Sequence, residues 1–114
     1  MLKKTILIDL DGVLNTYTGS FNPEFIPPIR AGAKEFLATL SQNYELKLFT
    51  TRSSELAMQW LEEYQLTSFF TEVTNIKKPA WLLVDDRCVT FDGNYDNLTE
   101  QITLFKPWYK SIPR

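Results

Sequence analysis

The sequence has no histidine and a single cysteine, Cys88, among its 114 residues. Without an imidazole, a general acid or base has to be a carboxylate, lysine, tyrosine or cysteine, and histidine-based triads and metal sites are excluded. One cysteine cannot form a disulfide within the chain. No apolar run approaches the roughly 18 residues of a membrane span, and the start MLKK leads straight into a predicted strand without a signal peptide. We therefore expect a cytoplasmic protein without a membrane partner.

The composition is that of an ordinary globular domain, with 44% hydrophobic and 23% charged residues. The length predicts a single domain over residues 1–114, with no room for a second core. The net charge of −2 gives no strong indication of a nucleic-acid partner.

Short apolar runs alternate with segments of helical periodicity along the chain. Strands are expected at residues 6–8, 46–49, 69–73 and 81–84, with a further short strand at 89–91. Helices are expected from Pro27-Pro28 to residues 42–43, after Ser53 or Ser54, and over residues 95–105, and a polar flap is expected at residues 15–28. Alternating strands and helices predict a parallel sheet with helices on both faces. The expected fold class is α/β, a three-layer α/β/α sandwich with a small, mainly parallel, Rossmann-like sheet.

Three of the predicted strands end in polar residues: Asp9 and Asp11, Thr50, and Asp85 with Asp86. The carboxyl ends of parallel strands meet at one edge of a sheet, where α/β proteins bind their ligands. Four carboxylates in one crevice repel one another strongly at low dielectric, so such a cluster needs a bound cation. Oxygen ligands without histidine or cysteine suit Mg²⁺ best. A hydroxyl and an ammonium group beside that ion would form a receptor for a phosphoryl group, and a carboxylate could then attack phosphorus.

These features resemble the haloacid dehalogenase (HAD) superfamily of phosphohydrolases. The sequence DLDGVL, a hydrophobic strand that ends in Thr50, a lysine, and a strand that ends in Asp85-Asp86 occur in the family's order and span residues 5–86. Each motif alone is weak, but together, each at a predicted strand end, they are specific. The resemblance implies a Mg²⁺-dependent phosphatase that hydrolyses a phosphate monoester through an aspartyl-phosphate.

The resemblance also implies a role for each matching residue. Asp9 would be the nucleophile, and Asp11 would be the general acid and then the general base. Thr50 would hydrogen-bond a phosphoryl oxygen. The metal site would consist of Asp9, the backbone carbonyl of Asp11, Asp85 and Asp86, with Asp86 as the favoured direct ligand.

The chain departs from the family's usual pattern in two places. Seven residues separate Lys77 from Asp85, whereas a parallel crossover normally needs a dozen or more. Residues 69–73 are therefore expected to form only an edge strand, and the phosphate-side cation is either Lys77 or Lys78. Lys77 is favoured because Lys78 precedes a proline and is held extended. The chain also has no room for a cap domain, so we expect an open site and a phosphorylated substrate that can be large.

Other interpretations stay open. A HAD-type phosphotransferase would use the same residues, and a phosphate-binding module with little or no turnover would keep them intact. A receiver-like module also holds a phosphoaspartate, but its acidic pair follows the first strand, whereas Asp85-Asp86 follows the last of the main strands here. Arg52 and Arg87 come shortly after motif residues, and they either contact the substrate or pair with the carboxylates.

Overall fold

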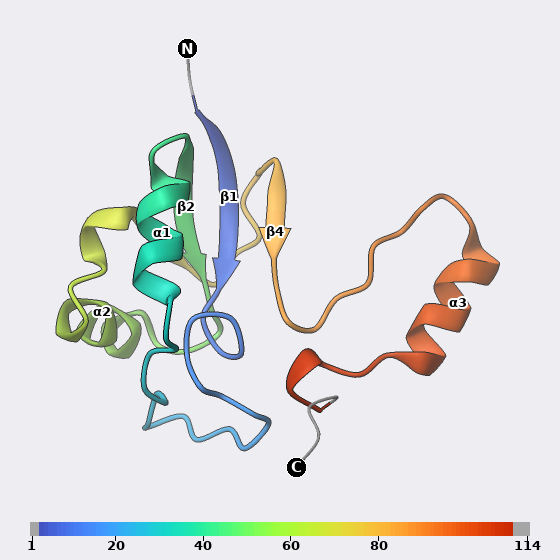
Figure 1. Ribbon diagram of the computed structural model, residues 1–114, viewed down its shortest axis with the longest axis horizontal. Helices are drawn as coiled ribbons and strands as arrows, with labels where there is room; N and C mark the ends of the chain where they lie inside the picture. Colours follow the sequence, from blue (N-terminus) through green and yellow to red (C-terminus); the bar gives the residue numbers. More distant parts are fainter. Residues whose placement is uncertain (1–2, 111–114) are drawn as a thin grey trace.

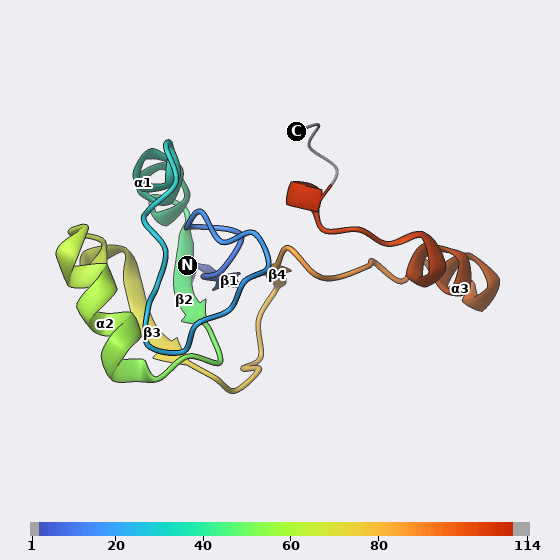
Figure 2. The same cartoon turned by 90° about the horizontal axis from the view of Figure 1, so that it is seen from below.

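The computed structural model describes residues 3–110 and contains a four-stranded, all-parallel sheet in the order β3-β2-β1-β4 (Figure 1 and Figure 2). The strands are β1 (Lys4–Asp9), β2 (Tyr44–Phe49), β3 (Phe70–Thr74) and β4 (Leu82–Val84). The helices are α1 (Ala33–Ser41), α2 (Ser54–Glu63) and α3 (Tyr95–Leu104), with the short 3₁₀ helices η1 (Thr67–Phe69) and η2 (Trp108–Lys110). The predicted α/β class and parallel sheet are confirmed, and no inserted cap domain interrupts the described residues.

β1 is an inner strand because its middle is apolar on both faces. Residues 6–8 are almost completely buried, as expected for a strand that is covered on both sides. β2 pairs with one edge of β1 and β4 with the other, and Ile8 lies opposite both Leu48 and Val84. The residues that follow Ile8 and Val84 therefore emerge side by side at the carboxyl edge of the sheet.

α1 and α2 cover the same face of the sheet (Figure 2). α2 begins as predicted, because the Ser53 side chain caps it by accepting a hydrogen bond from the Leu56 N–H at 3.1 Å. The two helices and the alternate residues of β1 and β2 share one apolar core. Its strand and helix members include Ile6, Ile8, Leu46, Leu48, Ala33, Leu37, Ala57, Trp60 and Leu61.

No helix covers the opposite face of the sheet within residues 3–110. After β3, residues 75–81 run back across this face, and Trp81 donates its backbone N–H to the Thr5 carbonyl oxygen at 2.9 Å. Figure 2 shows this segment on the side of the sheet away from α1. The third layer is thus an extended segment where a helix was expected, because the connection between β3 and β4 is too short for one.

Residues 15–28 form the predicted flap, but the helix after it begins later than expected. An antiparallel bridge between Asn15 and Ile29 closes the base of the flap. This pairing holds the chain extended through Ile29, and Gly32, with a φ of 89°, stands immediately before Ala33 at the start of α1. The prediction that the two prolines before Ile29 open the helix is therefore wrong.

The C-terminal part of the described chain extends away from the sheet. The predicted helix at residues 95–105 is present as α3, whereas residues 89–91 do not form a strand. Figure 1 shows α3 well apart from the sheet, and none of its residues is buried. η2 then returns, and the Trp108 indole N–H donates to the Gly12 carbonyl oxygen at 2.8 Å. We call residues 87–107 the arm and the rest of the described chain the body. No helix in either part has the length and apolar character needed to cross a membrane.

Candidate active site

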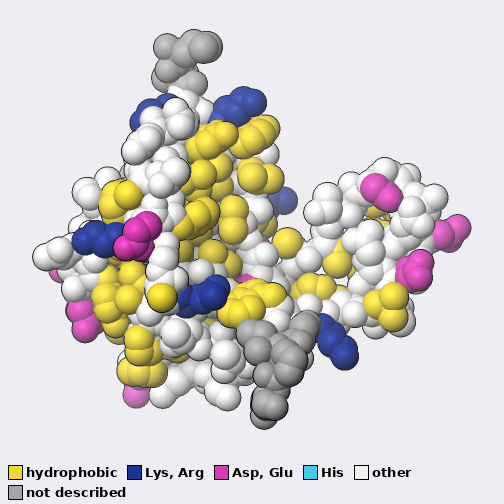
Figure 3. Space-filling model, viewed as in Figure 1, with side chains coloured by type: hydrophobic (Ala, Val, Ile, Leu, Met, Phe, Trp, Pro, Cys, Tyr) yellow, Lys and Arg dark blue, Asp and Glu magenta, His cyan; other side chains and the backbone are white. Residues whose placement is uncertain are grey.

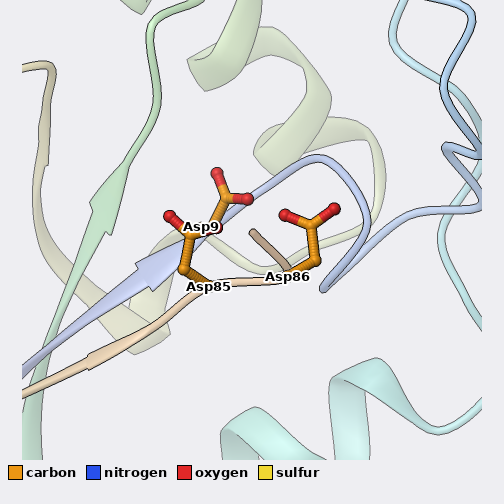
Figure 4. Close-up of side chains that lie close together, drawn as sticks. All are labelled: Asp9, Asp85 and Asp86. Carbon is orange, nitrogen blue, oxygen red and sulfur yellow. The ribbon is translucent and has the colours of Figure 1, made fainter. Parts of the chain in front are cut away.

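Three carboxylates meet beyond the carboxyl ends of β1 and β4. Asp9 is the last residue of β1, and Asp85 and Asp86 directly follow β4. One carboxylate oxygen from each residue lies within 4.8 Å of the other two, and Figure 4 shows the three side chains gathered together. All three residues are half-buried. Asp86 Oδ2 is buried and has no hydrogen-bond partner in the described part of the chain.

The cluster favours a bound cation on electrostatic grounds. Burial, followed by the neighbouring Asp86 and Asp85 carboxyls, raises the pKa of Asp9 from 3.8 to about 9. Burial also raises the pKa of Asp85, although the Arg87 backbone N–H opposes this shift by donating to Asp85 Oδ1 at 2.8 Å. A divalent cation favours the ionised form of each carboxylate and would reverse these shifts. The all-oxygen ligand set and the unpaired Asp86 oxygen fit a hard cation such as Mg²⁺.

The carboxylates line a cavity of about 390 Å³ together with other predicted site residues. Thr50 is nearly buried, its Oγ1 accepts a hydrogen bond from the Arg52 backbone N–H at 3.2 Å, and its own N–H donates to the Thr74 carbonyl at 3.0 Å. All the predicted site residues except Lys77 line this cavity. Its lining residues are Asp9, Asp11, Tyr17, Phe21, Phe49, Thr50, Thr51, Asp85, Asp86 and Arg87.

The two candidate lysines lie outside this cavity. Lys77 lines a separate cavity with Leu7, on the face of the sheet away from α1. Lys78 lies 3.7 Å from Glu72 in an ion pair. Residues 75–81 carry both lysines along that face, because no helix intervenes to hold the segment at the carboxyl edge. Arg87 is the basic residue that lines the acidic cavity.

Gly12 permits the close approach of the two acidic motifs. Its φ of +80° lies in the left-handed region that favours glycine. A Cβ atom at this position would lie 2.2 Å from Asp86 Oδ2 and 2.7 Å from Asp86 Cγ. Any larger residue would therefore push Asp86 out of the cluster.

Arg52 holds Asp11 in a bidentate ion pair. Arg52 Nε lies 2.8 Å from Asp11 Oδ2, and Nη2 lies 3.0 Å from Oδ1. The Arg52 side chain is completely buried, and that of Asp11 is 17% exposed. Arg52 Nη1 also donates to the Asn22 carbonyl oxygen in the flap at 2.8 Å, and the guanidinium lies 4.6 Å from the centre of the Phe21 ring. Arg52 thus fixes the orientation of the Asp11 carboxylate and ties it to the flap.

Two residues that shape the site were not identified from the sequence. Asn15 is completely buried, and its Oδ1 accepts the backbone N–H groups of Gly12 at 3.1 Å and Tyr17 at 3.0 Å. The second of these bonds is an Asx turn, which an asparagine two residues before Tyr17 could have indicated. Tyr109 is nearly buried, and its burial together with the Asp86 carboxylate raises its pKa to about 12. Nothing local in the sequence points to this contact between Tyr109 and a residue 23 positions earlier.

Comparison with known proteins places these residues in a family. The family model described as NLI interacting factor-like phosphatase matches residues 4–97, which include the carboxylate cluster. The chain belongs to this family. The NLI interacting factor-like phosphatases are a HAD-like group, so the resemblance inferred from the sequence is confirmed. The protein is a phosphatase, a hydrolase that acts on phosphate ester bonds.

One solved structure supports the fold. It is described as the structure of a conserved protein from Bacteroides thetaiotaomicron, and it is 22% identical to this chain with a TM-score of 0.61. The match covers 98% of this chain and 99% of that one. Because the identity is low, this similarity concerns the fold alone. Comparison with curated protein sequences found no match.

Proposed function

We propose that this NLI interacting factor-like phosphatase hydrolyses phosphate monoesters in the presence of Mg²⁺, through an aspartyl-phosphate on Asp9. The observation that supports this most strongly is the approach of Asp9, Asp85 and Asp86 to within 4.8 Å at the ends of two adjacent strands. Asp9, Asp85, Asp86 and the Asp11 carbonyl would hold the ion. When bound, Mg²⁺ supplies positive charge that offsets the repulsion between an anionic nucleophile and a phosphate ester.

In the proposed reaction, Asp9 and Asp11 would carry out the chemistry and other residues of the cavity would bind the phosphoryl group. An Asp9 oxygen attacks phosphorus, and the bond from phosphorus to the leaving oxygen breaks as Asp11, which enters this step protonated, gives that oxygen its proton. Asp11 then takes a proton from the water that attacks the aspartyl-phosphate, which releases inorganic phosphate and regenerates Asp9. Thr50 and Arg87, which line the cavity, would hold the phosphoryl oxygens. Lys77 would take this role only if residues 75–81 moved toward the carboxyl edge of the sheet.

The substrate is proposed to be a phosphorylated molecule that can be large. The body carries no cap domain within residues 3–110, and the flap contributes Tyr17 and Phe21 to the wall of the cavity. A cytoplasmic location and a single domain over residues 1–114 stay predictions.

The metal requirement is tested by hydrolysis of p-nitrophenyl phosphate with Mg²⁺ and with EDTA. We expect EDTA to abolish turnover and added Mg²⁺ to restore it. Asp86→Asn should raise the Mg²⁺ concentration needed for half-maximal rate by at least about 10-fold, because it removes one charged ligand. Turnover that persists in EDTA would contradict the proposal. An intact protein that binds phosphate with Mg²⁺ but hydrolyses no ester in a broad screen would instead be a binding module.

A further inference from the structure

The arm makes the molecule less compact than a typical domain of the same length. The radius of gyration is 15.1 Å, whereas a compact domain of this length has about 13 Å. α3 has ten residues, none of them buried, and Figure 3 shows the arm standing apart from the body. A helix this short is marginal in water without tertiary packing. The arm therefore needs a surface on which to pack.

One side of α3 is apolar. Tyr95, Leu98, Ile102 and Phe105 follow one another at spacings of three and four residues, which places them along one face of the helix. Tyr95 is 75% exposed and Ile102 is 61% exposed. Tyr95 stacks on Phe91 within the arm, with the ring centres 5.1 Å apart, but an apolar helix face that stays this exposed marks a surface for a partner.

The free edge of the sheet offers a matching apolar surface. β4 is an edge strand, and Trp81 and Leu82 at its start are 53% and 47% exposed. Tyr44 extends this surface by stacking on Trp81, with the ring centres 5.6 Å apart. Figure 3 shows a band of hydrophobic side chains over β1 and β4, beside α1. We call Tyr44, Trp81 and Leu82 the edge surface.

The two surfaces carry opposite charge. Lys4 Nζ lies 4.4 Å from the centre of the Trp81 ring. The segment 88–105, by contrast, contains three acidic residues and no lysine or arginine. Packing α3 on the edge surface would thus bring acidic and basic side chains together around an apolar contact.

We propose that α3 packs on the edge surface of a second copy of this chain, and that two copies exchange arms. The arm is attached at both of its ends to the carboxyl edge of the sheet, where it follows Asp86 and where Trp108 bonds to Gly12. The edge surface lies at the amino ends of β2 and β4, away from these attachments. Because α3 stands apart from its own sheet in Figure 1, we place it on a second copy, and a two-fold axis lets each copy give one arm and receive another.

The mass of the full chain in solution tests the proposal. We expect sedimentation analysis to give twice the chain mass of 13.3 kDa. Ile102→Glu on α3 and Leu82→Glu on the edge surface should each give the mass of one chain. Leu104→Glu is the matched control, because Leu104 is 69% exposed and lies about 200° around the helix from Ile102. This variant should stay dimeric. A wild-type protein that is monomeric up to about 1 mM would overturn the proposal.

A disulfide experiment separates exchange from folding back. In a Cys88→Ser background, Ile102→Cys and Leu82→Cys are made singly, mixed and oxidised. The mixture should give a covalent dimer that joins one chain of each kind. A mixture that gives no such dimer would contradict the proposal. An internal disulfide in the variant that carries both cysteines would show that α3 packs on its own sheet. Neither result depends on phosphatase activity, so this inference and the proposed function can fail separately.

Discussion

The body and the arm differ in what holds their residues in place. In the body, the Arg52 side chain is completely buried and makes three hydrogen bonds, to Asp11 and to the flap. In the arm, none of the ten residues of α3 is buried. The candidate chemistry thus rests mainly on side chains that the core holds in place, whereas α3 has an exposed apolar face that is free for binding. Changes in the body should therefore affect catalysis and stability, and changes in α3 should affect association.

The largest expected effect is a loss of kcat when an aspartate of the body is changed to asparagine, and the same change in the arm is its control. Asp9→Asn removes the proposed nucleophile and should lower kcat by at least about 1,000-fold. Asp96→Asn makes the same chemical change on α3 and should leave kcat within about twofold, since surface charges away from the site act weakly. Steady-state hydrolysis of p-nitrophenyl phosphate measures both. Equal rates for wild type and Asp9→Asn would contradict the assignment of the site to the body.

Removal of Arg52 should have the next largest effect. Arg52→Gln leaves the Asp11 carboxylate, 17% exposed, without its charged partner, although Asn15 Nδ2 still donates to Oδ1 at 3.0 Å, and this loss costs about 3 kcal/mol of stability. Without this anchor Asp11 can turn from the leaving oxygen, so hydrolysis of an alkyl phosphate should fall by about 100-fold. The rate of p-nitrophenyl phosphate hydrolysis should fall less, because its leaving group needs little protonation.

Lys47→Gln is the matched control for Arg52→Gln. Lys47 pairs with Glu45 at 3.7 Å and with Glu72 at 3.5 Å, and it does not line the acidic cavity. Its loss should leave the ratio of the two hydrolysis rates unchanged. If Arg52→Gln lowers both rates by the same factor, Arg52 acts on something other than proton transfer by Asp11.

The third effect is a pH dependence of stability in EDTA. The pKa of Asp9 is about 9 in the folded chain, against 3.8 as its usual value. Between these values the unfolded chain has lost a proton that the folded chain keeps, so stability falls as pH rises, by up to about 1.4 kcal/mol per pH unit from this group. Asp9→Asn lacks this loss and should gain stability over the wild type from pH 5 to pH 8. Urea unfolding of both proteins at pH 5 and at pH 8 measures the difference between their free energies of unfolding. If this difference is no larger at pH 8 than at pH 5, the pKa of Asp9 is not raised.

The smallest effect compares two helix caps. Ser53 accepts the Leu56 N–H in the body at 3.1 Å, and Asn94 accepts the Asn97 N–H in the arm at 3.0 Å. Ser53→Ala should lower the free energy of global unfolding by about 1 kcal/mol. Asn94→Ala should leave global unfolding unchanged and speed hydrogen exchange in α3 alone. Equal losses in global unfolding would mean that the arm folds together with the body.

Local patterns in the sequence predicted the parts of the molecule that depend on local structure. β1 and β4 are apolar runs that end in acids, and the ends of parallel strands converge, so Asp9, Asp85 and Asp86 could be placed together from the sequence. Helical spacing likewise predicted α3. The Ser53 cap was recognisable for the same reason.

Features that depend on distant contacts could not be predicted in this way. Arg52 and Asp11 lie 41 residues apart, so the sequence left open whether Arg52 pairs with a carboxylate or contacts the substrate. The position of Lys77 depends on the path of residues 75–81 across the sheet, which no local pattern determines. The same holds for α3, because periodicity predicts an apolar face but not the surface that covers it.

The residue that carries the phosphoryl group during turnover can be identified directly. The protein is quenched during turnover with Mg²⁺ and a phosphate ester, reduced with borohydride, digested and sequenced by mass spectrometry. An aspartyl-phosphate is reduced to homoserine, so we expect homoserine at position 9 and none in the Asp9→Asn variant. Turnover with an unmodified Asp9, or with homoserine at another aspartate, would contradict the mechanism.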